Sequence, residues 1–164
     1  MFTKNLVYSF AVIAVLLLPA CGQKDETEKE PAPLKVINVL DVGQYDDAHI
    51  KGSINMSYDQ LEAGAATWNK ETPVVVYCSN YMCTGSAQGA KMLASKGFKH
   101  AYAYEGGMAE WYQLHKNDPS YALEGPAKLS YLELVMEKPA EHDADVKIIS
   151  AEELKKMMKE ANLL

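Results

Sequence analysis

The sequence predicts an α/β fold with a mainly parallel central sheet flanked by helices, and three observations support this. Residues 36–40 and 74–77 are short, continuous apolar runs rich in β-branched side chains, which suit strands buried on both faces. Residues 87–94 place their apolar side chains on one helical face, and Gly97 then supplies a stop. Alternation of strands and helices along the chain favours a parallel sheet covered by helices.

The first 20 residues predict a secretory signal. Lys4 precedes the apolar run 6–18, which would rise about 20 Å as a helix, too short for a hydrocarbon core of about 30 Å. The ending Leu18-Pro19-Ala20-Cys21-Gly22 resembles a bacterial lipobox, which implies that Cys21 is lipidated and becomes the new N-terminus. By the same resemblance, Gly22 directly after the lipidated cysteine favours sorting of the protein to the outer membrane. A periplasmic protein cleaved nearby and an uncleaved anchor are the alternatives.

Residues 21–33 predict a charged, proline-ended tether that holds a domain away from the membrane. The domain is therefore expected to be lipid-anchored and to work in the periplasm or elsewhere outside the cytoplasm. There its thiols meet oxidants rather than glutathione.

The rest of the chain divides into three expected parts. Residues 34–117 hold the strands, including a third at 101–104, and a short helix after Gly106-Gly107. Residues 118–145 are expected to be a linker or irregular extension, in which the state of 129–135 is left open. Residues 146–164 end in a helix: Ser150 and Glu153 have the spacing of a capping box, and four apolar side chains follow at helical spacing, namely Leu154, Met157, Met158 and Ala161.

The charge balance argues against a nucleic-acid partner. The 164-residue chain has 16 Lys and no Arg against 22 acidic residues, a formal net charge of −6. It therefore offers neither a basic stripe nor the bidentate guanidinium that phosphates favour. Three isolated His residues, namely His100, His115 and His142, and a Cys-x4-Cys spacing do not predict a metal site.

The chemistry-bearing segment lies between the strand at 74–77 and the following helix, and it begins with Cys78. A loop between a strand's end and a helix N-terminus aims backbone N–H groups at one point, and the helix dipole adds positive potential. A thiolate there is stabilised and acts as a nucleophile. Two alternatives stay open: Cys78 is a buried structural cysteine, or it forms a disulfide with Cys83, contributing about 2 kcal/mol.

Several motifs lie within 34–117, about half of the chain. They are the strand at 36–40, Tyr45 with His49-Ile50-Lys51-Gly52-Ser53-Ile54-Asn55, the strand that delivers Cys78, and Gly97-Phe98, Tyr104, Gly106-Gly107 and Trp111. In order and spacing they resemble the motifs of the rhodanese (sulfurtransferase) domain. The resemblance implies a three-layer domain, a persulfide on Cys78, ping-pong transfer from a small sulfur donor to a thiol acceptor, and no cofactor. It also implies that backbone N–H groups of the loop bind the donor; the loop comprises Ser79, Asn80, Tyr81, Met82, Cys83, Thr84 and Gly85.

Two departures from the family pattern matter. The loop has no Arg or Lys, so an oxyanion loses charge-assisted hydrogen bonds of about 1.5–3 kcal/mol each. Thiosulfate is therefore expected to be a poor donor, and a persulfide or polysulfide a better one. In addition, Cys83 is a candidate resolving thiol that would attack the Cys78 persulfide, release reduced sulfur and leave a disulfide. The alternative is that Cys83 only packs.

The C-terminal segment 146–164 resembles the strand and helix with which rhodanese domains usually begin. We therefore expect a circularly permuted domain, in which residues 138–145 span the gap; the rival is the start of a truncated second domain. Two further classes of function remain beside a sulfurtransferase: a non-catalytic binding module of the same fold, and a thiol–disulfide redox protein that uses Cys78 and Cys83. The oligomeric state is left open.

Overall fold

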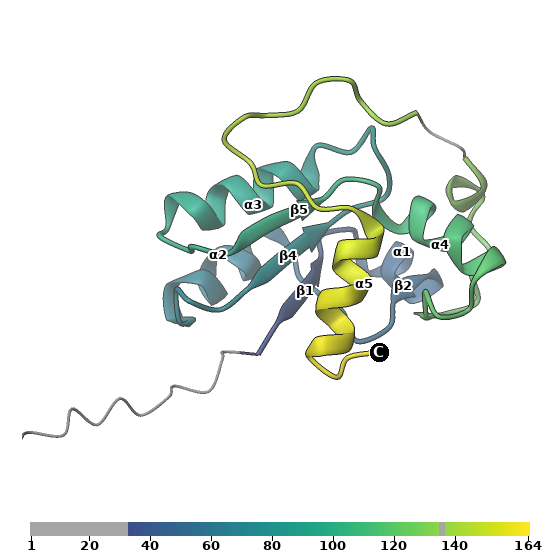
Figure 1. Cartoon of the computed structure of the whole chain (residues 1–164), viewed down its shortest axis with the longest axis horizontal. Helices are drawn as coiled ribbons and strands as arrows, with labels where there is room; N and C mark the ends of the chain where they lie inside the picture. Colours follow the sequence, from purple (N-terminus) through teal and green to yellow (C-terminus); the bar gives the residue numbers. More distant parts are fainter. Residues whose placement is uncertain (1–32, 135–136) are drawn as a thin grey trace, which may run out of the picture. The chain divides into compact units, whose positions relative to one another are not determined.

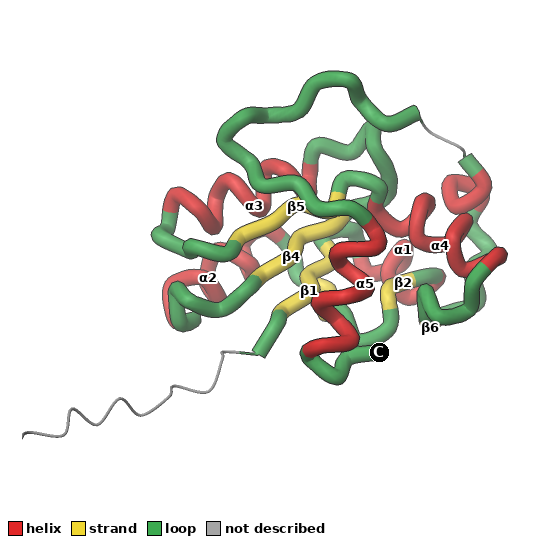
Figure 2. The backbone as a smooth tube through the Cα atoms, in the orientation of Figure 1, coloured by secondary structure: helices red, strands yellow, loops and turns green. Residues whose placement is uncertain are grey.

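The computed structural model describes residues 33–134 and 137–164. Its strands are β1 (Lys35–Asn38), β2 (His49–Ile50), β3 (Ile54–Asn55), β4 (Val74–Tyr77), β5 (Ala101–Tyr104) and β6 (Leu123–Glu124). Its helices are α1 (Val42–Asp47), α2 (Tyr58–Thr67), α3 (Gly85–Ser95), α4 (Gly107–Asn117), the 3-10 helix η1 (Ser130–Glu133) and α5 (Ala151–Glu160), as Figures 1 and 2 show. The predicted signal segment, Cys21 and the tether up to residue 32 lie outside the described residues.

A parallel sheet with the strand order β3-β1-β4-β5 forms the centre of the domain, as predicted. The strands expected at 74–77 and 101–104 are confirmed with those bounds. The first strand ends at Asn38, two residues earlier than predicted. The Asn38 side-chain oxygen accepts the backbone N–H of Leu40 at 2.8 Å. This local bond engages the Leu40 N–H, which would otherwise be available to a neighbouring strand.

Successive side chains of the strands alternate between two apolar cores, one on each face of the sheet. On one face Ile37, Val74 and Val76 pack with the buried side chains of α2 and α3. On the other face Val36 and Val75 pack with those of α4 and α5. The three-layer arrangement predicted by the resemblance is therefore present, with α2 and α3 on one side and α4 and α5 on the other (Figure 1).

Residues 118–134, where we expected an irregular extension, contain regular structure that belongs to the same core. β6 pairs with β2 in a small antiparallel ladder. Tyr121 and Leu132 are buried in the same cluster as Trp111 of α4. Within 129–135, whose state the sequence left open, Ser130–Glu133 form the 3-10 helix η1, and residue 135 lies outside the described residues.

The C-terminal segment continues the main sheet beyond β5. Ile148 lies opposite Ala103 in a parallel bridge, and the Ala103 N–H and C=O bond with Lys147 and Ile149 at 2.9 and 3.0 Å. The capping box of Ser150 and Glu153 is present. Beyond this bridge α5 buries Leu154 and Met158 completely, so the segment contributes side chains to the core.

Among the residues that the structure describes, no helix combines the length and apolar character needed to cross a membrane.

Candidate active site: the cysteine loop between β4 and α3

The cysteine loop, residues 78–84, begins where β4 leaves the centre of the sheet. All four residues of β4 are buried, and Cys78 follows them with only 4% of its surface exposed. The chain then turns through Ser79 and Asn80 and enters α3 at Gly85. A buried central strand thus delivers the Cys78 sulfur to the N-terminal end of an eleven-residue helix, as the sequence predicted.

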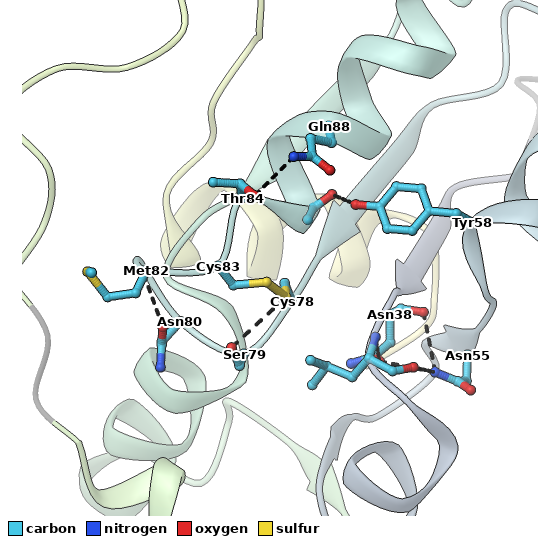
Figure 3. Close-up of a disulfide and its surroundings, with 12 residues drawn as sticks. Asn38, Asn55, Tyr58, Cys78, Ser79, Asn80, Met82, Cys83, Thr84 and Gln88 are labelled. Atoms are coloured by element: carbon cyan, nitrogen blue, oxygen red, sulfur yellow. Dashed lines mark hydrogen bonds between the residues drawn. A yellow bond between two sulfur atoms is a disulfide. The ribbon is translucent and has the colours of Figure 1, made fainter.

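Cys78 and Cys83 form a disulfide within this loop (Figure 3). Their Cα atoms are 6.2 Å apart, within the usual range for such bonds. The disulfide alternative is therefore the form present in the structure, and the free thiolate is not. A nucleophilic Cys78 requires prior reduction of this bond.

The N-terminus of α4 holds the start of the loop through two backbone hydrogen bonds. Met108 N–H donates to the Cys78 carbonyl at 3.0 Å, and Ala109 N–H donates to the Ser79 carbonyl at 2.9 Å. Gly107 makes this approach possible. Its φ is +60°, and a Cβ there would lie 2.6 Å from the Cys78 oxygen. Gly107 of the Gly106-Gly107 motif thus supports the cysteine loop directly.

Asn80 organises the middle of the loop. Its side-chain oxygen accepts the Met82 N–H at 3.0 Å, and its carbonyl accepts the Cys83 N–H at 3.0 Å. These two amides are therefore engaged inside the loop in the oxidised form. The prediction that the N–H groups of the whole segment bind a donor needs correction here, because a hydrogen-bonded N–H is not free for a ligand.

Tyr58 of α2 reaches across to the beginning of α3, a contact that the sequence analysis missed. Its hydroxyl donates to the Gly85 carbonyl (Figure 3), and burial raises the pKa of this tyrosine. A Cβ at Gly85 would lie 3.1 Å from the Tyr58 oxygen and 3.3 Å from the Cys78 sulfur. The helix start is therefore packed tightly against both sulfurs. No local pattern marked Tyr58, because its partner is 27 residues away.

The surroundings of the loop are acidic. Tyr81 donates its hydroxyl to Glu110 at 2.8 Å, and burial, followed by this bond, raises its pKa well above the ordinary value. Glu105, after β5, pairs with His142 at 2.7 Å. Met82 projects into solvent with 73% of its surface exposed. The structure adds carboxylates to a loop that has no cation of its own.

The remaining predicted residues have structural contacts. His49 stacks on Tyr45 and lies 3.3 Å from Glu124, and Trp111 and Tyr104 are buried. Within the described ranges, no group of three or more His, Cys, Asp or Glu side chains has the arrangement of a metal site.

Comparison with known proteins agrees with this geometry. The family model of the rhodanese-like domain matches residues 23–114, more than half of the chain. The chain therefore belongs to the rhodanese-like domain family. Its α/β fold with a central parallel sheet between helices is the one that the resemblance predicted.

Individual relatives carry more specific names. The thiosulfate sulfurtransferase GlpE of Coxiella burnetii is 32% identical over 80 residues, which cover 49% of this chain and 73% of the relative. The protein of the same name from Shewanella oneidensis is 25% identical over 84 residues, covering 51% and 81%. Among solved structures, the rhodanese-like domain of Alr3790 from Anabaena has a TM-score of 0.45 at 29% identity, covering 52% of this chain and 84% of that one.

Proposed function

We propose that this protein is a rhodanese-type sulfurtransferase that carries sulfane sulfur as a persulfide on Cys78. The observation that carries the proposal is the position of Cys78, between a buried strand and the N-terminus of α3. Once reduced, its thiolate would be stabilised by the helix dipole and by nearby N–H groups without a histidine partner. The names of the relatives support the same reaction class.

The chemistry proceeds in two half-reactions. The Cys78 thiolate attacks the outer sulfur of a donor R–S–SH, forming Cys78–S–SH and releasing R–S⁻. A thiol acceptor then removes the outer sulfur and restores the thiolate. Because the loop has no cation and Glu105 and Glu110 lie nearby, the preferred donor is a persulfide or polysulfide that need not present an oxyanion, rather than thiosulfate.

The disulfide favours a second candidate function in the same site. The Cys83 thiolate would attack the inner sulfur of the Cys78 persulfide, forming the Cys78–Cys83 disulfide and releasing the outer sulfur as HS⁻. The sulfane sulfur is thereby reduced and the two cysteines are oxidised. An external thiol must then reduce the disulfide before the next cycle.

Intact mass measurement separates these functions. The full-length chain with Cys21→Ser, which leaves Cys78 and Cys83 as its cysteines, is reduced and exposed separately to a small persulfide and to thiosulfate. One added sulfur that survives removal of the donor and is lost with Cys78→Ser supports the carrier. With Cys83→Ser the added sulfur should persist longer than in the parent if Cys83 resolves it, and equally long if Cys83 only packs.

Other results would contradict the proposal. Absence of added sulfur with both donors would favour a binding module. A loss of two hydrogens without sulfide release would favour thiol–disulfide exchange as the main activity. Equal loading from thiosulfate and the persulfide would contradict the argument from the uncharged loop.

We further propose that the domain is lipid-anchored outside the cytoplasm through Cys21, on the outer membrane where the cell has one. The lipobox-like ending of the first 21 residues supports this, and a disulfide in the domain is consistent with an oxidising compartment. Labelling with a radioactive fatty acid should mark the wild-type protein and spare Cys21→Ser. Equal labelling of both would contradict the anchor.

A further inference from the structure

A pocket of about 370 Å³ opens beside the disulfide, between the loop, α3 and a later segment of the chain. One wall is formed by Cys83, Thr84 and the first turns of α3. The opposite wall belongs to the strap, residues 137–145, which precedes the C-terminal segment and lines the pocket with Pro139, Glu141, His142 and Asp143. The strap thus builds a site next to a reactive sulfur.

The two sulfurs of the disulfide differ in their access to this pocket. Cys83 lines it, whereas Cys78 is 96% buried, with 4% of its surface exposed. We therefore expect a thiolate that enters the pocket to reach the Cys83 half of the disulfide first. Thiol–disulfide exchange requires direct approach to one sulfur, so access decides which bond forms.

The expected exchange also has a suitable leaving group. The entering RS⁻ bonds to the sulfur of Cys83, the Cys78–Cys83 bond breaks, and its electron pair leaves on Cys78 as a thiolate. The N-terminus of α3 stabilises that thiolate, and a less basic leaving thiolate departs faster. A second RS⁻ then releases RSSR and the Cys83 thiolate, so two thiols are oxidised for one disulfide reduced.

The strap is held in place by ion pairs with the domain. Lys91 of α3 lies 2.8 Å from Asp143 and 3.3 Å from Asp145, so its charge is compensated by two carboxylates. Glu105 pairs with His142 of the strap at 2.7 Å. These contacts position the second wall of the pocket.

The charge of the pocket is negative. Glu105, Glu141 and Asp143 contribute three carboxylates to the lining, against the ammonium of Lys91 and the ring of His142. Glu141 is exposed at the lining of the pocket, and its carboxylate has neither an ion pair nor a hydrogen bond among the described residues. An anionic thiol would be repelled here, and a cationic one attracted.

We propose that this pocket is the docking site for the thiol that reduces the Cys78–Cys83 disulfide, that the thiol attacks Cys83, and that Glu141 selects thiols without negative charge. The role of this step rests on the proposed function. It frees the Cys78 thiolate before the first cycle of the sulfur carrier, and in every cycle if Cys83 attacks the persulfide. The pocket chemistry itself can be tested without any sulfur donor.

The first test compares three two-carbon thiols that differ in charge: cysteamine, 2-mercaptoethanol and 2-mercaptoethanesulfonate. Each rate of disulfide reduction in the full-length Cys21→Ser chain is followed by quenched intact mass as the gain of two hydrogens. Each rate is divided by that of the same thiol with a small neutral disulfide, which removes differences in thiol basicity. We expect cysteamine to exceed the sulfonate by about fivefold at low salt, with the ratio falling as salt rises.

Two matched variants test whether this charge selectivity comes from Glu141. Glu141→Gln should reduce the ratio about twofold by removing one uncompensated charge. Glu160→Gln makes the same chemical change on an exposed residue of α5, outside the pocket, and should leave the ratio unchanged. Equal normalised rates for the three thiols, or equal effects of the two variants, would overturn the assigned selectivity.

The second test locates the attacked sulfur. During reduction by cysteamine, free thiols are capped with N-ethylmaleimide, and cleavage after Lys70 and Lys91 yields one peptide that holds both cysteines. Fragmentation should place cysteamine on Cys83 and the maleimide on Cys78. The reverse arrangement would overturn the assignment, as would a chain that cannot be brought to the disulfide state. Failure of persulfide formation on Cys78 would instead reject the proposed function and leave these two readouts unaffected.

Discussion

Truncation of Leu154 in α5 tests whether the C-terminal segment is part of the domain. The Leu154 side chain is fully buried in the core on the α4 side of the sheet, together with Met158. We propose that residues 146–164 complete this domain, in the position expected for a permuted opening unit. Leu154→Ala then leaves a cavity between α5 and the sheet.

The expected loss of folding stability is large for one substitution. Replacing a fully buried Leu by Ala removes its transfer free energy and leaves unfilled volume, together about 3 kcal/mol. For a domain of this size each kcal/mol lowers the melting temperature by about 3–4 °C, so the expected shift is about 10 °C. Lys156→Ala, on the exposed face of the same helix, should change stability by less than about 0.5 kcal/mol.

Urea unfolding followed by far-UV circular dichroism and by tryptophan fluorescence measures both variants. Trp111 lies in the same buried cluster as Leu154 and Trp68 packs against the opposite cluster, so the combined emission reports on both cores. A loss below about 1 kcal/mol for Leu154→Ala would refute the reasoning. So would a chain lacking residues 146–164 that still unfolds cooperatively with unchanged stability, the behaviour expected if the segment began a separate domain.

Two further predictions concern the loop support and the contact between α4 and α5. Gly107→Ala should lower the free energy of unfolding by about 3 kcal/mol, because it adds a clash with the Cys78 carbonyl to the strain of a positive φ. Gly97→Ala, at φ +90° with open space, should lower it by about 1–2 kcal/mol. Urea unfolding compares the two variants, and equal losses of stability would contradict the close approach of Gly107 to the loop. Hydrogen bonds from Ser120 and Lys155 lower the pKa of Asp118. Because the folded pKa of Asp118 is the lower one, its contribution to the stability of the fold is present above the unfolded pKa of about 3.9. This contribution is lost as the pH falls toward the folded pKa. Asp118→Asn should thus be less stable than wild type at pH 7, with a difference that shrinks below about pH 4, and a difference independent of pH would contradict this.

The central strands and the helices with clear patterns could be predicted from local sequence. β4 and β5 are short apolar runs, and α5 has a capping box and apolar spacing, so their signals lie within a few residues. The shorter elements could not. β2 and β6 have two residues each, and their pairing joins residues more than 70 positions apart. α1 buries no residue and has no apolar face to detect.

The sequence by itself determined the family, the position of Cys78 before a helix, the absence of cations in its loop, and the apolar patterns of β1, β4, β5 and of the helices α3, α4 and α5, but not α2 or β3. These properties follow from residue type and short-range spacing. Only the tertiary structure decided that Cys78 bonds to Cys83, that Asn80 engages two loop amides, and that the strap encloses an acidic pocket beside Cys83. Such contacts depend on how turns and segments distant in sequence meet, because their energies come from tertiary packing and pairing rather than from local preference.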